Sequence, residues 1–219
     1  MCGRFAITLP TDAMAQLFKA QPANNLPDVP NFNVCPTNFI HVITSNQFGR
    51  NLERFRWGFV PKWYQELNAG PLLINARSET IAEKPAFSNA CKKRRCLIPC
   101  AGFYEWSKDI EGNKTPWFVQ RNDETPLVFG GVWQEWGDEI NKIKTCAIVT
   151  TASNSNLSGI HDRLPLVLER GDWSFWLGEK GHGASILMRP TANETLSAYK
   201  VSKDINSNRS AGPDLLSPF

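Results

Sequence analysis

The most distinctive residue for chemistry is Cys2, which directly follows the initiator methionine. Removal of Met1 would make Cys2 the N-terminal residue, with an α-amine and a thiol on the same residue. An α-amine titrates close to neutral pH, so a useful fraction is uncharged and can attack an aldehyde to form a Schiff base. A 1,2-aminothiol can then close a five-membered thiazolidine ring. A cysteine alone is more often a small buried apolar residue, so the rest of the chain must decide between these interpretations.

Four short polar segments interrupt apolar runs, and each carries side chains that could act on a ligand. They are residues 2–4, 75–77, 102–106 and 161–165. In the third segment, Glu105 ends an apolar strand between Tyr104 and Trp106. A carboxylate among aromatic neighbours loses water, which suits it to proton transfer near neutral pH. The alternative is a strand end at which Glu105 points to solvent.

The second and fourth segments offer further candidates. His161 lies in a loop that precedes a predicted strand, where catalytic groups are often displayed; the alternative is a surface histidine that caps a turn. The other two histidines are assigned no role. Asn75 and Arg77 end a predicted strand, and Arg77 could either clamp a phosphate or pair with Glu79.

The densest positive charge is the run Lys92-Lys93-Arg94-Arg95. It could face a phosphate backbone. The alternative is a solvated helix end, because cations at a helix C-terminus are favoured by the helix dipole. Residue types alone leave both interpretations open.

The composition describes a globular protein with a real core. A chain of 219 residues with 42% hydrophobic and 21% charged residues predicts one domain over 1–219, with a polar tail from about residue 206. A net charge of +3 neither requires nor excludes nucleic acid. The chain contains no run that could span a membrane and no apolar leader, so we expect a cytoplasmic protein that joins the nucleoid when bound to DNA.

The six cysteines are expected to be reduced thiols in that compartment. Cys91, Cys96 and Cys100 cluster, but they lack a paired zinc-ligand spacing and have no histidine nearby. Buried thiols are therefore favoured over structural zinc, and we expect neither a metal nor a cofactor.

The elements that must position these residues are mainly strands. Helices are predicted at 13–20, 61–67, 82–92 and 172–177, and a loop at 21–38. Strands are predicted at 39–44, 52–59, 72–75, 96–106, 116–120, 127–136, 144–151 and 164–168. Because strands outnumber helices and follow one another, the prediction is an α+β fold. Its core would be a strongly curved, antiparallel-rich sheet or barrel flanked by short helices.

Five motifs in order resemble one family. They are MCGR at 1–4, WGFVPKW at 57–63, INARSET at 74–80, IPCAGFYEW at 98–106 and HDRLP at 161–165. The chain resembles the SRAP family (SOS-response-associated peptidase domains), the abasic-site processing proteins, from Met1 to about Ser202.

The resemblance implies a covalent reaction with DNA. Cys2 would attack the ring-opened aldehyde of an abasic site in single-stranded DNA and form a thiazolidine crosslink that shields the lesion. Asn75 would hydrogen-bond around the linkage, Glu105 would move protons, and His161 would assist sugar ring opening and β-elimination. The matching DNA-contacting residues are Arg4, Arg77 and Arg163 for phosphates, and Trp63 and Trp106 for stacking on bases.

Two alternatives to a crosslinking enzyme with associated lyase activity remain open. One is a thiol peptidase that removes the residue ahead of Cys2, with His161 or Glu105 as its base. The other is a non-covalent reader of single-stranded or modified DNA that uses Arg4, Arg77 and the tryptophans. The expected partner is single-stranded DNA with abasic sites and not a membrane. A monomer is expected, because DNA must reach Cys2.

Overall fold

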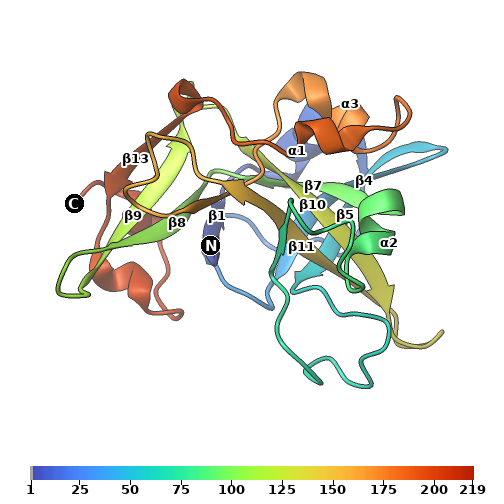
Figure 1. The fold of residues 1–219 in the computed structure, drawn as a ribbon. Coiled ribbons are helices and arrows are strands. Elements are labelled where there is room, and N and C mark those ends of the chain that lie inside the picture. Colours follow the sequence, from blue (N-terminus) through green and yellow to red (C-terminus); the bar gives the residue numbers. More distant parts are fainter. Residues whose placement is uncertain (1) are drawn as a thin grey trace.

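The computed structural model describes residues 2–219, a part of the chain dominated by strands with a few short helices (Figure 1). A closed barrel of five strands forms its centre. Neighbouring strands of the barrel are antiparallel except for β11 and β5, whose parallel contact closes the ring. The barrel strands are β4 (Phe39–Asn46), β5 (Gly49–Trp57), β7 (Arg95–Cys100), β10 (Leu127–Trp136) and β11 (Ile143–Ala152). The predicted α+β fold with a barrel-like core is therefore confirmed.

A second antiparallel sheet lies beside the barrel (Figure 1). Its order is β13 (Leu196–Lys200), β9 (Lys114–Arg121), β8 (Gly102–Lys108), β1 (Arg4–Ile7) and β3 (Asn31–Val34). The start of β1 lies between the two sheets in Figure 1. The N-terminal segment with Cys2 is thus placed at the junction of barrel and sheet.

The strand predicted at 96–106 is in fact two strands that belong to different sheets. β7 ends at Cys100 and β8 begins at Gly102, while the N–H of Ala101 donates to the carbonyl of Ala6 over 2.8 Å. A side chain at Gly102 would lie 2.4 Å from the Phe118 ring, so this crossing point requires glycine. The switch carries Glu105 out of the barrel and into the sheet that contains β1.

Two short strands flank the C-terminal half of β11. β6 (Asn75–Arg77) pairs in parallel along one edge, and β12 (Arg163–Pro165) pairs antiparallel along the other. Both reach Thr150, which lies opposite Arg77 on one side and Pro165 on the other. The motifs INARSET and HDRLP are therefore brought together across one strand.

The helices are short and lie outside the barrel. They are α1 (Thr11–Phe18), α2 (Ser88–Lys93), α3 (Trp173–Trp176) and 3-10 turns at Arg170–Asp172, Ala184–Leu187, Asn193–Thr195, Lys203–Asn206 and Pro213–Leu216. α1 buries Met14 and Phe18, and the Phe18 ring stacks on Trp173 at 4.5 Å. No helix between residues 2 and 219 is long and apolar enough to cross a membrane.

Several predicted elements were wrong. The loop at 21–38 contains β3 and the end of β2 (Ala20–Pro22), which pairs with β5. The helix at 61–67 is a series of turns, in which the Trp136 indole donates to the carbonyl of Tyr64. The helix at 82–92 is reduced to α2, and the strand at 72–75 is shifted toward β6.

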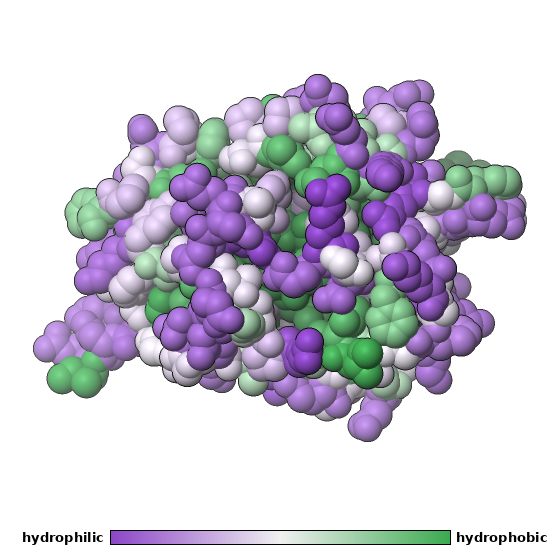
Figure 2. Space-filling model, turned by 90° about the horizontal axis from the view of Figure 1, so that it is seen from above, coloured by the Kyte–Doolittle hydropathy of each residue, from purple (hydrophilic) through white to green (hydrophobic). Residues whose placement is uncertain are grey.

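The C-terminal segment, with the polar tail from about residue 206, is packed against the rest of the protein. Its short turns pack on the second sheet, where Ile205 and Leu215 are buried with Tyr104 and Phe118. The C-terminal segment also accepts a hydrogen bond from Arg4 of the N-terminal strand, as described below. On the face shown in Figure 2, hydrophilic residues surround smaller hydrophobic areas.

Candidate functional site around Cys2

Cys2 is buried, and its position is fixed by Asn75. The Asn75 side-chain nitrogen donates to the Cys2 carbonyl oxygen over 2.8 Å, and Cys2 is 0% exposed. The other amide atom, Asn75 Oδ1, is buried and has no hydrogen-bond donor among residues 2–219. A buried acceptor without a donor is costly, so this oxygen is suited to accept a proton from a bound ligand.

The Cys2 thiol is neutral in this state. Burial raises its pKa far above the usual value, and the Glu105 carboxylate adds to that shift by repelling a thiolate. The backbone N–H of Arg4 acts in the opposite direction. While Met1 is attached, the Cys2 nitrogen is an amide, so both nucleophiles need activation before they can react.

Glu105 is a buried neighbour of Cys2. It lies on β8 beside β1, faces Trp117 across the pair with β9, and is 4% exposed. The solvent-facing alternative for Glu105 is therefore wrong. Because its charge acts on the Cys2 thiol, a proton acceptor lies within electrostatic reach of the nucleophile.

His161 lies in the loop between β11 and β12, with its side chain 27% exposed. Its Nδ1 accepts from the backbone N–H of Arg163 over 2.9 Å and lies 2.7 Å from Asp162 Oδ1. The first contact favours a ring with its proton on Nε2, whereas the second is attractive only when the ring is charged. Both contacts are made by Nδ1, so they orient the ring in the loop before β12.

Arg163 forms a two-pronged ion pair with Glu79. Its Nη1 and Nη2 donate to the two Glu79 oxygens over 2.6 and 2.9 Å, and Nη2 also donates to the Thr150 carbonyl. Glu79 thus pairs with Arg163 and not with Arg77. Arg77 is exposed and takes part in no ion pair among the residues described. Of these two arginines, Arg77 is the better placed for a phosphate.

Arg4 and Trp106 are engaged by the C-terminal tail. Arg4 Nη1 donates to Asn33 Oδ1 over 2.7 Å and to the Ile205 carbonyl over 3.0 Å. The Trp106 indole donates to Asn206 Oδ1 over 2.7 Å. Sequence reasoning missed Asn33 and the tail, because no local pattern links residues that lie about 200 positions apart.

Trp63 lies away from this cluster, in the turns that follow β5. Its indole is 56% exposed and forms an edge contact with the Tyr64 ring, with ring centroids 6.4 Å apart. The loop that carries Trp63 is closed at its base by a bridge between Phe59 and Leu73, two residues before Asn75. No cluster of histidine, cysteine or acidic residues that could hold a metal is found within 2–219.

The chain is similar to known proteins over nearly its whole length. The model of the family "SOS response associated peptidase (SRAP)" matches residues 1–208. The chain is similar to the abasic site processing protein YoqW of Bacillus subtilis, with 32% identity over 99% of both chains. It is also similar to YedK of Escherichia coli, with 29% identity over the full length of each. A crystal structure from Bacteroides thetaiotaomicron superposes with a TM-score of 0.87, at 26% identity and full coverage of both chains.

Proposed function

From the premise that this chain belongs to the SOS response associated peptidase (SRAP) family of abasic site processing proteins, we propose that Cys2 forms a covalent crosslink with abasic sites in single-stranded DNA. The observation that carries the proposal is the junction of Cys2, Asn75 and Glu105. These three residues come from three separate motifs and meet at one buried point.

The reaction begins at the Cys2 amine after Met1 has been removed. The amine attacks the aldehyde carbon of the ring-opened sugar, and loss of one water leaves a Schiff base. The thiol then adds to the same carbon, and its proton passes to the nitrogen as the thiazolidine ring closes. A neutral thiol supplies that proton, which is consistent with the raised pKa of Cys2.

Glu105 and Asn75 have complementary roles in this scheme. Glu105 accepts the amine proton and returns it to the departing hydroxyl, so one carboxylate serves two steps. The Asn75 nitrogen holds the Cys2 backbone, while its unpaired Oδ1 accepts from a sugar hydroxyl or from the new N–H. His161 exchanges the proton that opens the sugar ring, and the same exchange supports β-elimination as an associated lyase reaction.

Recognition rests on charge and stacking because an abasic site has no base edge to read. Exposed Arg77 would hold a phosphate, and exposed Trp63 would stack on a flanking base. Stacking favours a single strand, in which bases are accessible. Three other candidates already have protein partners: Arg4, Arg163 and Trp106. They would stabilise the structure around the site, or exchange these partners for DNA when it binds.

The test is denaturing gel electrophoresis with a single-stranded oligonucleotide bearing one abasic site. Wild-type protein whose intact mass shows loss of Met1 should give a heat- and detergent-stable shifted band. Cys2→Ala should give none, and the undamaged oligonucleotide should remain unshifted. A stable band with Cys2→Ala would overturn the proposal, and salt-sensitive binding without any stable band would favour the non-covalent reader.

A further inference from the structure

A small cavity of about 270 Å³ lies beside Trp63, outside the Cys2 cluster. It is bounded by the turns after β5, by the segment around α2 and by β10. Its lining residues are Lys62, Trp63, Pro85, Ala86, Asn89, Arg94 and Gln134. The lining thus combines an exposed indole with two cationic side chains.

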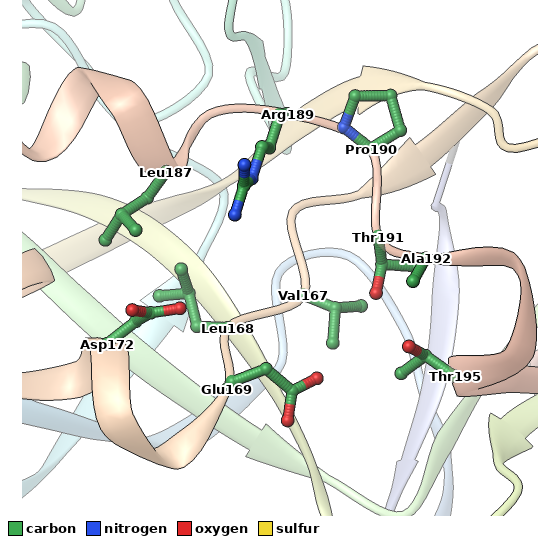
Figure 3. Close-up of a pocket in the computed structure, with 10 residues that line it drawn as sticks. All are labelled: Val167, Leu168, Glu169, Asp172, Leu187, Arg189, Pro190, Thr191, Ala192 and Thr195. Carbon is green, nitrogen blue, oxygen red and sulfur yellow. The ribbon is translucent and has the colours of Figure 1, made fainter.

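The charge of this lining sets it apart from the larger cavities. None of its lining residues is acidic, whereas four larger cavities of about 440, 490, 590 and 740 Å³ each include a carboxylate. Figure 3 shows one of them, in which Arg189 extends over a hollow that also carries Glu169 and Asp172. Carboxylates repel a phosphate, so among these cavities the one beside Trp63 is suited to an anion.

Arg94 is held in place without an acidic partner. Its Nε donates to the Trp133 carbonyl and its Nη2 to Gln134 Oε1, each over 3.1 Å. Gln134 in turn donates to the Val60 carbonyl over 3.1 Å. Partial burial lowers the pKa of Arg94, Glu135 opposes that shift from a distance, and no ion pair to Arg94 occurs within 2–219. A fixed, partly desolvated guanidinium without a counter-ion is typical of a phosphate site.

The basic run at 92–95 is divided by the fold. Arg95 turns the other way and donates to the carbonyls of Trp176, Cys91 and Lys92, so its role is structural. Lys92 and Lys93 end α2 and are exposed, as the solvated-helix interpretation expects. Arg94 alone of the four lines the cavity.

The cavity lies a short distance along β11 from the reaction site. Gln134 pairs with Thr145 on one side of β11, and Asn75 pairs with Ile148 on the other side of the same strand. Three residues along a strand span about 10 Å, and the two interstrand spacings across β11 add about 10 Å in the perpendicular direction. A stacked strand of nucleic acid advances about 3.4 Å along its axis per nucleotide, so the two places are separated by a few nucleotides.

We propose that the cavity is a subsite for a nucleotide of the damaged strand a few positions from the lesion, in which Arg94 and Lys62 hold a phosphate and Trp63 stacks on the base. This inference rests on the proposed function, because it assumes that the strand enters at Asn75. The cavity is smaller than sites for drug-sized ligands, which start at about 300 Å³, and this size suits one phosphate with the edge of its nucleotide. The subsite would determine whether it is the 5′ or the 3′ side of the lesion that crosses the cavity.

The test measures affinity apart from crosslinking. A fluorescent single-stranded oligonucleotide with one tetrahydrofuran abasic analogue has no aldehyde, so fluorescence anisotropy reports binding alone. Arg94→Gln and Lys62→Gln should each weaken binding about five-fold or more and lower the slope of log K against log salt by about 0.7, the value for one lost phosphate contact on a single strand. Arg189→Gln, which removes a cation from the acidic cavity of Figure 3, should change neither quantity.

A second readout separates a subsite from a structural role. Oligonucleotides that end at the lesion on the 5′ side or on the 3′ side remove the nucleotides on one side of it. The Arg94→Gln effect should persist with one series and disappear with the other. If Arg94→Gln lowers the melting temperature, Lys62→Gln decides, because Lys62 is exposed.

The outcomes distinguish the two proposals. Suppose that Arg94→Gln and Lys62→Gln both keep the affinity and the salt slope of the wild type, while the wild type still forms the crosslink. That result would overturn the subsite and leave the proposed function standing. An equal loss of affinity with both truncated series would also overturn it. If the wild type neither binds the analogue nor crosslinks to the abasic oligonucleotide, the proposed function and the subsite fail together.

Discussion

The side-chain amide of Asn75 holds the carbonyl of Cys2 at 2.8 Å, so the second residue of one motif fixes the reactive residue of another, 73 positions earlier in the chain. This contact ties β6 to the N-terminal segment. It leaves Asn75 Oδ1 buried and without a donor within 2–219, directly beside the nucleophile.

Replacement of Asn75 should slow the reaction more than it weakens binding. Asn75→Ala removes the donor to a buried carbonyl, at a cost of about 1–3 kcal/mol, and frees the Cys2 backbone. We expect the crosslinking rate at saturating DNA to fall about ten-fold or more. The measurement is single-turnover gel quantification, with the exposed Asn24→Ala as the matched control. An unchanged rate in Asn75→Ala would contradict the positioning role.

Glu105→Gln keeps the shape of the side chain and removes its proton transfer. General acid–base catalysis contributes roughly 10²–10⁴-fold, so the crosslinking rate should fall by about 100-fold. Single-turnover rates at pH 7 in wild type and variant test this, with the exposed Glu111→Gln as the control. Equal rates in Glu105→Gln and the wild type would remove Glu105 from the proton pathway.

The same substitution should make the Cys2 thiol more acidic. The Glu105 carboxylate raises the pKa of the Cys2 thiol because it repels the thiolate, so a neutral glutamine must lower that pKa. Burial is the larger cause of the shift and remains, so the pKa stays above its ordinary value. Alkylation of Cys2 with iodoacetamide, followed by peptide mass mapping against pH, should show faster labelling in Glu105→Gln. Slower labelling would contradict this arrangement.

The Arg163–Glu79 pair should make the free energy of unfolding depend on pH in the acidic range. Arg163 lowers the pKa of Glu79, so the stabilising contribution is present above the unfolded-state value and is lost as pH falls through the lower folded value. The Glu79 side chain is 51% exposed, so solvent screening limits the contribution to about 1 kcal/mol or less. Glu79→Gln should therefore reduce the free energy of unfolding more at pH 7 than at pH 3. Urea unfolding at both values checks this, with the exposed Glu83→Gln as control.

Trp63→Ala should weaken DNA binding without loss of fold. Its indole is 56% exposed, so little packing is lost, whereas stacking on a base is worth about 1–3 kcal/mol. The dissociation constant for the abasic-analogue oligonucleotide should rise by about 5- to 150-fold. Phe48→Ala at the tip of the β4–β5 hairpin removes an aromatic ring that is 89% exposed and should have no effect. Equal affinities for both variants and the wild type would exclude a stacking role.

Local pattern predicted the barrel strands well and the segments between them poorly. The strand at 127–136 has the predicted bounds, because Pro126 and Gly137 end a run that packs on both sides. The helix at 61–67 failed because a distant residue, Trp136, uses the Tyr64 carbonyl that a helix would need. The split at Ala101 left no periodic signal, since both halves are apolar and only their partners differ.

In the candidate site too, local sequence predicted some features and missed others. Motifs predicted Asn75 and Glu105, which both act on Cys2 in the structure, but not which of the other candidate residues already have protein partners. The Arg163–Glu79 pair spans 84 positions, and the bond from Arg4 to Ile205 spans 201. Such contacts are set by how the barrel and the sheet meet, and no spacing along the chain encodes them. Arg94 was visible only as part of a charged run until the fold separated it from Arg95.

The hydrogen bond from Arg4 to Ile205 ties the N-terminal strand to a segment 201 positions later in the chain. During synthesis, Arg4 leaves the ribosome long before Ile205 has been added, so this bond can form only after the segment around residue 205 exists. The aminopeptidase step that the proposed reaction requires would therefore have its opportunity before this bond fastens the N-terminal strand to that segment.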